Sequence, residues 1–325
     1  MTIATDPVLE IRDLSVQIET TRGVALALDQ VSLSIAAGET LAVVGESGSG
    51  KTMTALSILG LQPQVARIVG GEVLLNGRNL VGLSPTEWGS IRGSQIAMIM
   101  QDPLTALNPV FRVSRQVGEG PRVHQGLKGK LLQRRVVELL EMVKIPRAAQ
   151  RSRDYPHQFS GGMRQRVVGA IGIACHPTLL IADEPTTSLD VTVERAYLEL
   201  LKELQRETGV GILFVTHDFG IVESFADRVA VMYSGRVIET GPADQIIGQP
   251  AHPYTEGLVR SVPNLREPPP ARLPSIPGSP PELFSDKPAC HFAPRCSYVM
   301  DKCLSIEPPP FQVRDDQIAT CWRYE

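Results

Sequence analysis

The feature that most constrains this sequence is a glycine-rich stretch between an apolar segment and a segment with helical character. It matches the pattern G-x-x-x-x-G-K-[ST] at every fixed position, and its residues are Gly45, Glu46, Ser47, Gly48, Ser49, Gly50, Lys51 and Thr52. Glycines allow backbone N–H groups to turn inward around phosphate oxygens. We expect Lys51 to reach the β- and γ-phosphates and the Thr52 hydroxyl to ligate Mg²⁺. The stretch therefore predicts a nucleoside triphosphate site rather than an ordinary strand-to-helix turn.

Composition limits the classes of protein to which the chain can belong. With 325 residues, 42% of them hydrophobic, the chain can bury a large core, and we expect two domains or one large domain with an appendage. Thirty-two Lys and Arg oppose 35 Asp and Glu, giving a formal net charge of −3. Because no long basic run is present, the composition does not favour a nucleic-acid partner.

The expected location follows from hydropathy. No apolar stretch approaches the ~18 residues of a membrane span, and the first residues lack the charged-then-apolar pattern of an export signal. These patterns predict a cytosolic chain, in which cysteines are more often thiols or metal ligands than disulfides. Four of the five cysteines follow residue 289.

Periodicity along the chain predicts an α/β fold. Alternation over 8–35 predicts half-buried antiparallel strands, and 71–77, which ends in an Asn-Gly turn, predicts a further strand of that sheet. An apolar strand over 95–100 is followed by Gln101, which could sense a metal or the attacking water. Residues from about 104 to 157 lose the strand pattern and predict an α-helical subdomain.

A second anion-binding pattern lies downstream. Ser160, Gly161 and Gly162 precede an uninterrupted helical run, and Ser160 is suited to cap that helix. One reading is an ordinary capped helix. The other is a second phosphate half-site, in which two chains face each other and each closes on the γ-phosphate that the other holds.

Three further candidates follow strands that we predict to be buried. Asp183 and Glu184 end one strand, where alternation places their side chains on different faces. Asp183 could hold Mg²⁺ through water, and Glu184 could accept a proton from the water that attacks the γ-phosphate. His217 follows the next strand, at an edge where open α/β sheets bind ligands. A solvated strand end and a structural histidine are the alternative readings.

These motifs, in this order, resemble the ATP-binding cassette (ABC) ATPases of transporters over roughly residues 8–250. The resemblance implies a P-loop NTPase core with an antiparallel β subdomain and an α-helical subdomain. It also implies ATP hydrolysis in a head-to-tail dimer that sandwiches two ATP molecules. The implied roles are catalysis by Glu184, His217 and Gln101, Mg²⁺ binding by Thr52, Gln101 and Asp183, a signature acting in trans from Ser160, Gly161, Gly162 and Gln165, and a dimer-interface loop of Ser188, Leu189 and Asp190.

Residues 251–258 and the cysteine-rich tail look like those of peptide and nickel importer ATPases. That resemblance implies a second, different ATPase chain, two permease chains and an extracytoplasmic substrate-binding protein. The expected cargo is dipeptides or oligopeptides, with nickel or another small solute as the alternative, and the expected location is the cytoplasmic side of the membrane. A soluble ABC ATPase of DNA repair or translation is less favoured, because the chain has a single phosphate loop and a slightly acidic balance.

The position of the adenine base is less well defined by the sequence. Family members usually stack adenine on an aromatic residue of the front sheet, but here no Phe, Tyr or Trp precedes Trp88. Arg22 or Ile18 lies near the expected position, and an arginine could stack through its guanidinium plane.

We divide the chain into an ATPase domain over 1–260, a proline-rich linker over 261–285 and a cysteine-rich module over 286–325. The cysteines of the module are Cys290, Cys296, Cys303 and Cys321, in the spacing C-x5-C-x6-C-x17-C. So short a segment buries little apolar surface, so a metal group is a plausible source of its stability. Loose spacing favours a [4Fe–4S] cluster over zinc, with free thiols or disulfides as further alternatives. A module that senses redox state or iron could also regulate the ATPase.

Overall fold

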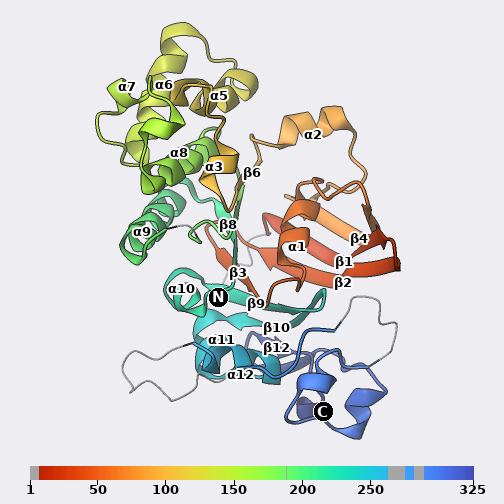
Figure 1. The fold of residues 1–325 in the computed structure, drawn as a ribbon. Helices are drawn as coiled ribbons and strands as arrows, with labels where there is room; N and C mark the ends of the chain where they lie inside the picture. The colour runs from red at the N-terminus through yellow and green to blue at the C-terminus, as the bar shows by residue number, and fades with distance from the viewer. Residues whose placement is uncertain (1–6, 188, 263–274, 282–288) are drawn as a thin grey trace. The chain divides into compact units, whose positions relative to one another are not determined.

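The computed structural model describes residues 7–187, 189–262, 275–281 and 289–325 (Figure 1). The chain divides into two compact units. Unit 1 comprises Met1–Val8, Ile35–Glu39 and Gly82–Phe214, and unit 2 comprises Leu9–Ser34, Thr40–Val81 and Val215–Glu325. The predicted linker over 261–285 falls largely on residues outside the described ranges.

The sheet strands of unit 1 follow the order β8-β7-β6. They are β6 (Ile96–Ile99), β7 (Leu179–Asp183) and β8 (Gly211–Thr216), whose first four residues belong to this unit. Strands β6 and β7 are parallel, with Ile96 opposite Leu179. Every residue of β7 is buried, as expected for a parallel strand that is covered on both faces.

Helices make up most of the rest of unit 1. Their bounds are α2 (Pro85–Ile91), α3 (Pro103–Ala106), α4 (Val113–Val117), α5 (Glu119–His124), α6 (Gly129–Met142), α7 (Ala148–Arg151), α8 (Gly161–Ile173) and α9 (Val191–Thr208), with the short 3-10 helix η1 (Pro156–Gln158). The segment from about 104 to 157, predicted to be a helical subdomain, contains α3 to α7 and η1. Within it, α6 buries Val136, Leu139 and Leu140 on one face, and α4 and α6 pack against α8.

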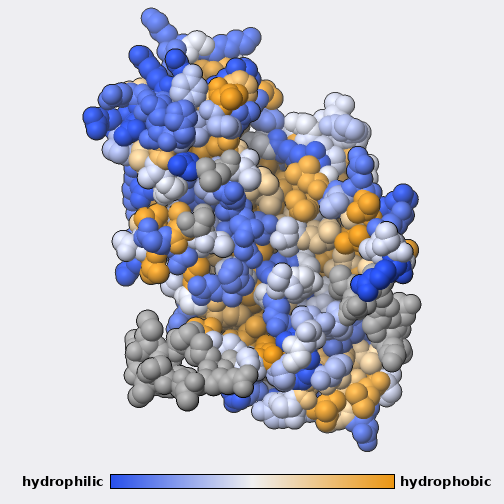
Figure 2. Space-filling model, viewed as in Figure 1, coloured by the Kyte–Doolittle hydropathy of each residue, from blue (hydrophilic) through white to orange (hydrophobic). Residues whose placement is uncertain are grey.

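Hydrophilic side chains cover much of the visible surface of this helical segment (Figure 2). A few apolar side chains are exposed on it, among them Val123 and Leu131. Within the described residues, no helix combines the length and the apolar character that a membrane span requires.

The first sheet of unit 2 has the order β2-β1-β4-β5. Its strands are β1 (Leu9–Thr20), β2 (Gly23–Ile35), β4 (Ala66–Leu75) and β5 (Arg78–Asn79). Strand β4 runs antiparallel to β1, and the turn Asn76-Gly77, both residues at positive φ, joins β4 to β5. The strand predicted over 71–77 is therefore present, and its Asn-Gly turn has the backbone that a two-residue hairpin requires.

The second set of strands in unit 2 has the order β11-β12-β10-β9-β3. They are β3 (Thr40–Val44), β9 (Arg228–Tyr233), β10 (Arg236–Pro242), β11 (Phe311–Arg314) and β12 (Gln317–Ala319). Strands β3 and β9 are parallel, and β10 pairs antiparallel with both β9 and β12. Part of the segment that the sequence suggested as a separate module thus continues the sheet that leads into the phosphate loop.

The helices of unit 2 are α1 (Lys51–Ile58), α10 (Phe219–Phe225), α11 (Ala243–Gly248) and α12 (Pro253–Arg260), with the 3-10 helices η2 (Ala293–Arg295), η3 (Asp301–Leu304) and η4 (Trp322–Tyr324). Three aromatic rings, Tyr233, Tyr254 and Phe292, pack together with ring centroids 4.6–5.4 Å apart. They belong to a core cluster that also includes Val44 and Val231. This cluster joins the tail to β3 and β9.

A buried carboxylate adds polar contacts to this packing. Glu239 of β10 is buried and accepts hydrogen bonds from the backbone N–H groups of Ala251 and His252, each at 2.8 Å. The Gln317 side-chain amide of β12 donates a third, also at 2.8 Å. His252 in turn caps α12, accepting the Tyr254 N–H at Nδ1, and burial lowers the pKa of His252 to about 3, which keeps the ring neutral.

Replacing Glu239 with Gln is expected to lower the free energy of unfolding by about 2 kcal/mol, because a neutral amide satisfies these buried donors less well. Denaturant titration of the purified chain measures the change. The control is Glu199→Gln, which alters an exposed Arg195–Glu199 pair and should cost less than about 0.5 kcal/mol. Equal stability of the two variants would contradict the role of Glu239.

Candidate functional site

The glycine-rich loop lies between β3 and α1 of unit 2. Gly45, Gly48 and Gly50 have φ values of 152°, 79° and 107°, a region that other residues rarely adopt. A Cβ on Gly45 would lie 2.2 Å from the carbonyl oxygen of Met232 in β9, so only glycine fits there. The loop therefore takes its shape from glycine at these positions.

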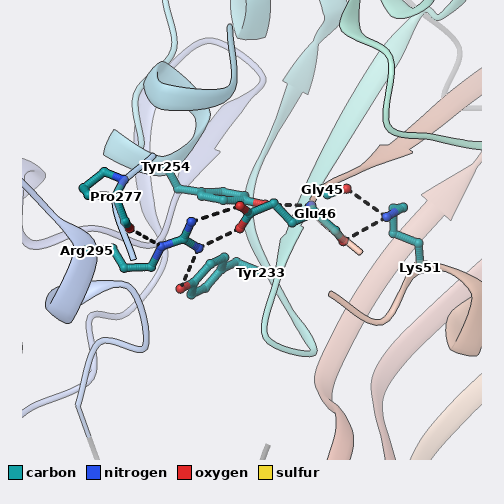
Figure 3. A network of polar contacts seen from close by, with 7 residues as sticks. All are labelled: Gly45, Glu46, Lys51, Tyr233, Tyr254, Pro277 and Arg295. Carbon is teal, nitrogen blue, oxygen red and sulfur yellow. Dashed lines mark hydrogen bonds and ion pairs between the residues drawn. The ribbon is translucent and has the colours of Figure 1, made fainter. Parts of the chain in front are cut away.

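Lys51, the first residue of α1, is buried, and its amine points back into the loop (Figure 3). Its Nζ donates to the carbonyl oxygens of Gly45 at 2.8 Å and Glu46 at 3.0 Å. This geometry holds one positive charge at the start of a helix, where the helix dipole also favours an anion. Thr52, the next residue, is exposed.

A cavity of about 370 Å³ adjoins the loop within unit 2. Both residues predicted as adenine contacts, Ile18 and Arg22, line it, together with the loop residues Glu46–Ser49. Other lining residues were not singled out as site residues by the sequence, among them Tyr233, Pro280 and Pro281. No local pattern could have indicated them, because they lie far from the loop in the sequence.

Gln101, Asp183 and Glu184 belong to unit 1, where the structure brings Gln101 and Glu184 into contact. The Gln101 Nε2 donates to Oε2 of Glu184 at 3.0 Å, and the Thr187 hydroxyl donates to the same oxygen at 3.3 Å. Asp183 is buried at the end of β7, whereas Glu184 is half-buried with a φ of 45°. Such left-handed backbone is strained for a glutamate and often marks a functional position.

The signature residues also belong to unit 1. The Ser160 hydroxyl caps α8 by accepting the Met163 N–H at 3.3 Å, which confirms the predicted cap. Ser160 and Gly161 are exposed. Gly162 faces α9, since a Cβ there would lie 2.6 Å from Val193 Cγ1. An exposed N-terminus of a 13-residue helix is consequently available for an anion.

Gln165, unlike Ser160 and Gly161, does not face solvent. Its side chain is fully buried, and its amide donates to the carbonyl oxygen of Pro185 at 2.6 Å. The amide thereby holds the segment that follows Glu184. This position favours an internal role for Gln165 over the predicted contact with a partner chain.

Two other predicted segments have local structural roles. In the predicted interface loop, Leu189 is half-buried, Asp190 caps α9 by accepting the Val193 N–H at 3.0 Å, and Ser188 lies outside the described residues. His217 of unit 2 is exposed directly after β8. The next residue, Asp218, caps α10 by accepting the Gly220 N–H at 2.7 Å.

The four tail cysteines gather around one small space. Cys290, Cys296, Cys303 and Cys321 all line a cavity of about 10 Å³, and no disulfide joins them. Burial raises the pKa of the Cys290 thiol to about 11 and also raises the pKa values of the Cys296 and Cys321 thiols. A cavity of this size is close to the smallest that can hold one water molecule.

In the described residues, these four thiols are not arranged as the ligands of a metal ion. Across the described residues, no group of three or more His, Cys, Asp or Glu side chains has the arrangement of a metal centre. The donor set nevertheless suits a thiolate-bound metal, so the [4Fe–4S] cluster, like the alternative zinc ion, stays a prediction without support from preformed geometry.

Comparison with known families gives two matches. Residues 28–187 match the family described as "ABC transporter". Residues 238–303 match the family described as "Oligopeptide/dipeptide transporter, C-terminal region". The first match contains the phosphate loop, Gln101 and the Asp183-Glu184 pair, and the second contains three of the four tail cysteines.

Individual proteins agree with these matches. The chain is 46% identical to the oligopeptide transport ATP-binding protein OppD of Bacillus subtilis, over 97% of this chain and 88% of that protein. It is 46% identical to the dipeptide transport ATP-binding protein DppD of the same organism, over 98% and 95%.

A solved ATP-binding cassette, a dimer in a post-hydrolysis state bound to ADP and Pi, is also similar. It has a TM-score of 0.64 at 27% identity, over 72% of this chain and 98% of the other. The chain belongs to the ABC transporter family of ATP-binding proteins, among those that carry the oligopeptide and dipeptide transporter C-terminal region.

Proposed function

We propose that this chain is the ATP-hydrolysing subunit of an ABC importer of dipeptides or oligopeptides. The observation that carries the proposal is the presence, in one chain, of an ATP-binding cassette and the C-terminal region of the oligopeptide and dipeptide transporters. ATP is the nucleotide, and hydrolysis is coupled to transport. The chain itself supplies the ATPase, so its permease partners supply the membrane path.

The phosphate loop binds the triphosphate, and Lys51 neutralises part of its charge. Thr52 and Asp183 carry oxygen ligands of the kind that Mg²⁺ prefers. The cavity lined by Ile18 and Arg22 has a volume of about 370 Å³ beside the loop and suits the adenosine part of ATP. Adenine stacks there on the guanidinium plane of Arg22 or packs on Ile18.

Glu184 is the general base that accepts a proton from the attacking water. Its hydrogen bond from Gln101 supports this assignment, because the amide orients one oxygen of the carboxylate. Gln101 thereby senses whether the metal and the attacking water are in place. His217 contacts the γ-phosphate. Hydrolysis then proceeds by positioning and electrostatic stabilisation, as is general for phosphoryl transfer.

Two ATPase chains close on each other in this proposal. The exposed helix start at Ser160 and Gly161 faces the γ-phosphate that the partner holds, and Leu189 and Asp190 lie at the interface. The dimer of the similar solved cassette supports this arrangement. The partner is a second, different ATPase chain, and the pair sits at the cytoplasmic side of the membrane on two permease chains. An extracytoplasmic binding protein delivers the peptide.

Replacing Glu184 with Gln is expected to lower the rate of ATP hydrolysis at least about 100-fold, because the amide cannot accept the proton. ATP binding should persist, and the closed dimer should accumulate. Phosphate release and size-exclusion chromatography with ATP measure both effects. The matched control is Glu199→Gln on the exposed face of α9, and hydrolysis by the Glu184 variant at the native rate would refute the base assignment.

Cargo is tested on the intact complex. Purification of the chain with its membrane partners should yield two permeases and a binding protein whose bound material is peptide by mass spectrometry. Recovery of nickel or another small solute instead would assign the alternative cargo. Recovery of ribosomes or DNA in place of permeases would refute the transporter function.

The tail thiols hold a metal group in this proposal. Four cysteines around one cavity are the donor set of an iron–sulfur cluster or of zinc. Protein purified without oxygen is expected to be brown and to contain iron and sulfide in equal amounts. Colourless protein with one zinc per chain would replace the cluster with zinc, and metal-free protein would leave the cysteines as thiols.

A further inference from the structure

An arginine of the C-terminal region contacts the phosphate loop directly. Arg295, the last residue of η2, donates from Nη1 to Glu46 Oε2 at 2.6 Å and from Nη2 to Glu46 Oε1 at 2.9 Å (Figure 3). The two residues are 249 positions apart, and both belong to unit 2. The Arg295 side chain is only 4% exposed. This is a bidentate ion pair, the strong form of such a contact, although the Glu46 side chain is 30% exposed.

Other contacts fix Arg295 in this position. Its Nε donates to the carbonyl oxygen of Pro277 at 2.8 Å, and its guanidinium lies 5.8 Å from the centre of the Tyr233 ring. The segment around Pro277 therefore helps η2 to orient the Arg295 guanidinium toward Glu46.

A second contact from the same region holds the backbone of Glu46. Tyr254, in α12, accepts the Glu46 N–H at its hydroxyl oxygen at 2.8 Å. The Glu46 carbonyl oxygen in turn accepts from Lys51 Nζ. A displacement of Glu46 would consequently disturb the lysine that reaches the phosphates.

The charge of Glu46 poses a problem for nucleotide binding. ATP carries about four negative charges, and a carboxylate in the loop that surrounds them would repel the ligand. Solvent screens a buried or half-buried charge poorly. Arg295 removes this repulsion by pairing with both oxygens of the carboxylate.

We propose that Arg295 is a positioning residue for ATP binding, which neutralises Glu46 and holds the phosphate loop in its binding conformation. The C-terminal region thereby sets the ATP affinity of the cassette. The inference rests on ATP binding by this chain and is independent of the cargo. The competing explanation is that Arg295 only ties the tail to the fold.

The test compares MgATP affinity and steady-state kinetics of full-length variants. Arg295→Gln is expected to raise the Kd and the KM for ATP about 10-fold with little change in kcat, since the lost contact acts on binding. Adding Glu46→Gln to this variant should restore the Kd to within about threefold of native, because the two residues are coupled. Arg295→Lys, which keeps the charge without the fork, should lie between native and Arg295→Gln.

The matched control is Arg314→Gln. Arg314 lies in the same tail but bonds to Gln317 and to the Gln249 carbonyl, away from the loop. Native ATP affinity in a folded Arg295→Gln variant would overturn the inference, and so would a loss that Glu46→Gln does not relieve. If Arg295→Gln does not fold, Tyr254→Phe decides: a several-fold weaker affinity supports the inference, and native affinity overturns it. A native chain that binds no ATP would instead refute the ATPase function itself.

Discussion

The close approach of the phosphate loop to β9 is the constraint on which the nucleotide site depends. At Gly45 the chain leaves β3 within van der Waals contact of the Met232 carbonyl, which leaves no room for a Cβ. The same turn lets the Lys51 amine reach two loop carbonyls. Because β3 and β9 are hydrogen-bonded neighbours, the loop is supported by a strand that the sequence delivers almost 190 residues later. Whatever stabilises β9 and its partner β10 therefore also stabilises the loop.

Local features could be predicted well from the sequence. The strand before His217, the Ser160 cap and the Asn76-Gly77 hairpin all depend on residues within a few positions of one another. Motif order identified the family because each motif is short and self-contained. The contact between Gln101 and Glu184 was not specified, but both residues were chosen because each follows a buried strand.

Long-range pairing could not be predicted. Neither the β10–β12 ladder nor the Arg295–Glu46 pair has a signature in the local sequence, since both depend on how a tail returns to a distant sheet. Gln165 illustrates another limit. Its place in the signature motif suggested a partner contact, but the helical period turns its side chain inward, where its amide bonds to Pro185. A motif predicts that residues act together without saying which of them face outward.

The tail illustrates how contacts with a distant sheet can hold a short segment in place. A short, cysteine-rich segment buries little apolar surface by itself, which favoured a metal group as its source of stability. In the structure the segment does not stand alone: β12 pairs with β10, Phe292 packs on Tyr233 and Tyr254, and Arg295 pairs with Glu46. These contacts hold the segment that carries the four thiols against β9, β10 and the phosphate loop. Arg295, which neutralises Glu46 of the phosphate loop, directly precedes Cys296. A group bound by the four thiols would therefore act on the segment that carries Arg295. Any effect of such a group on the ATPase is expected at the phosphate loop.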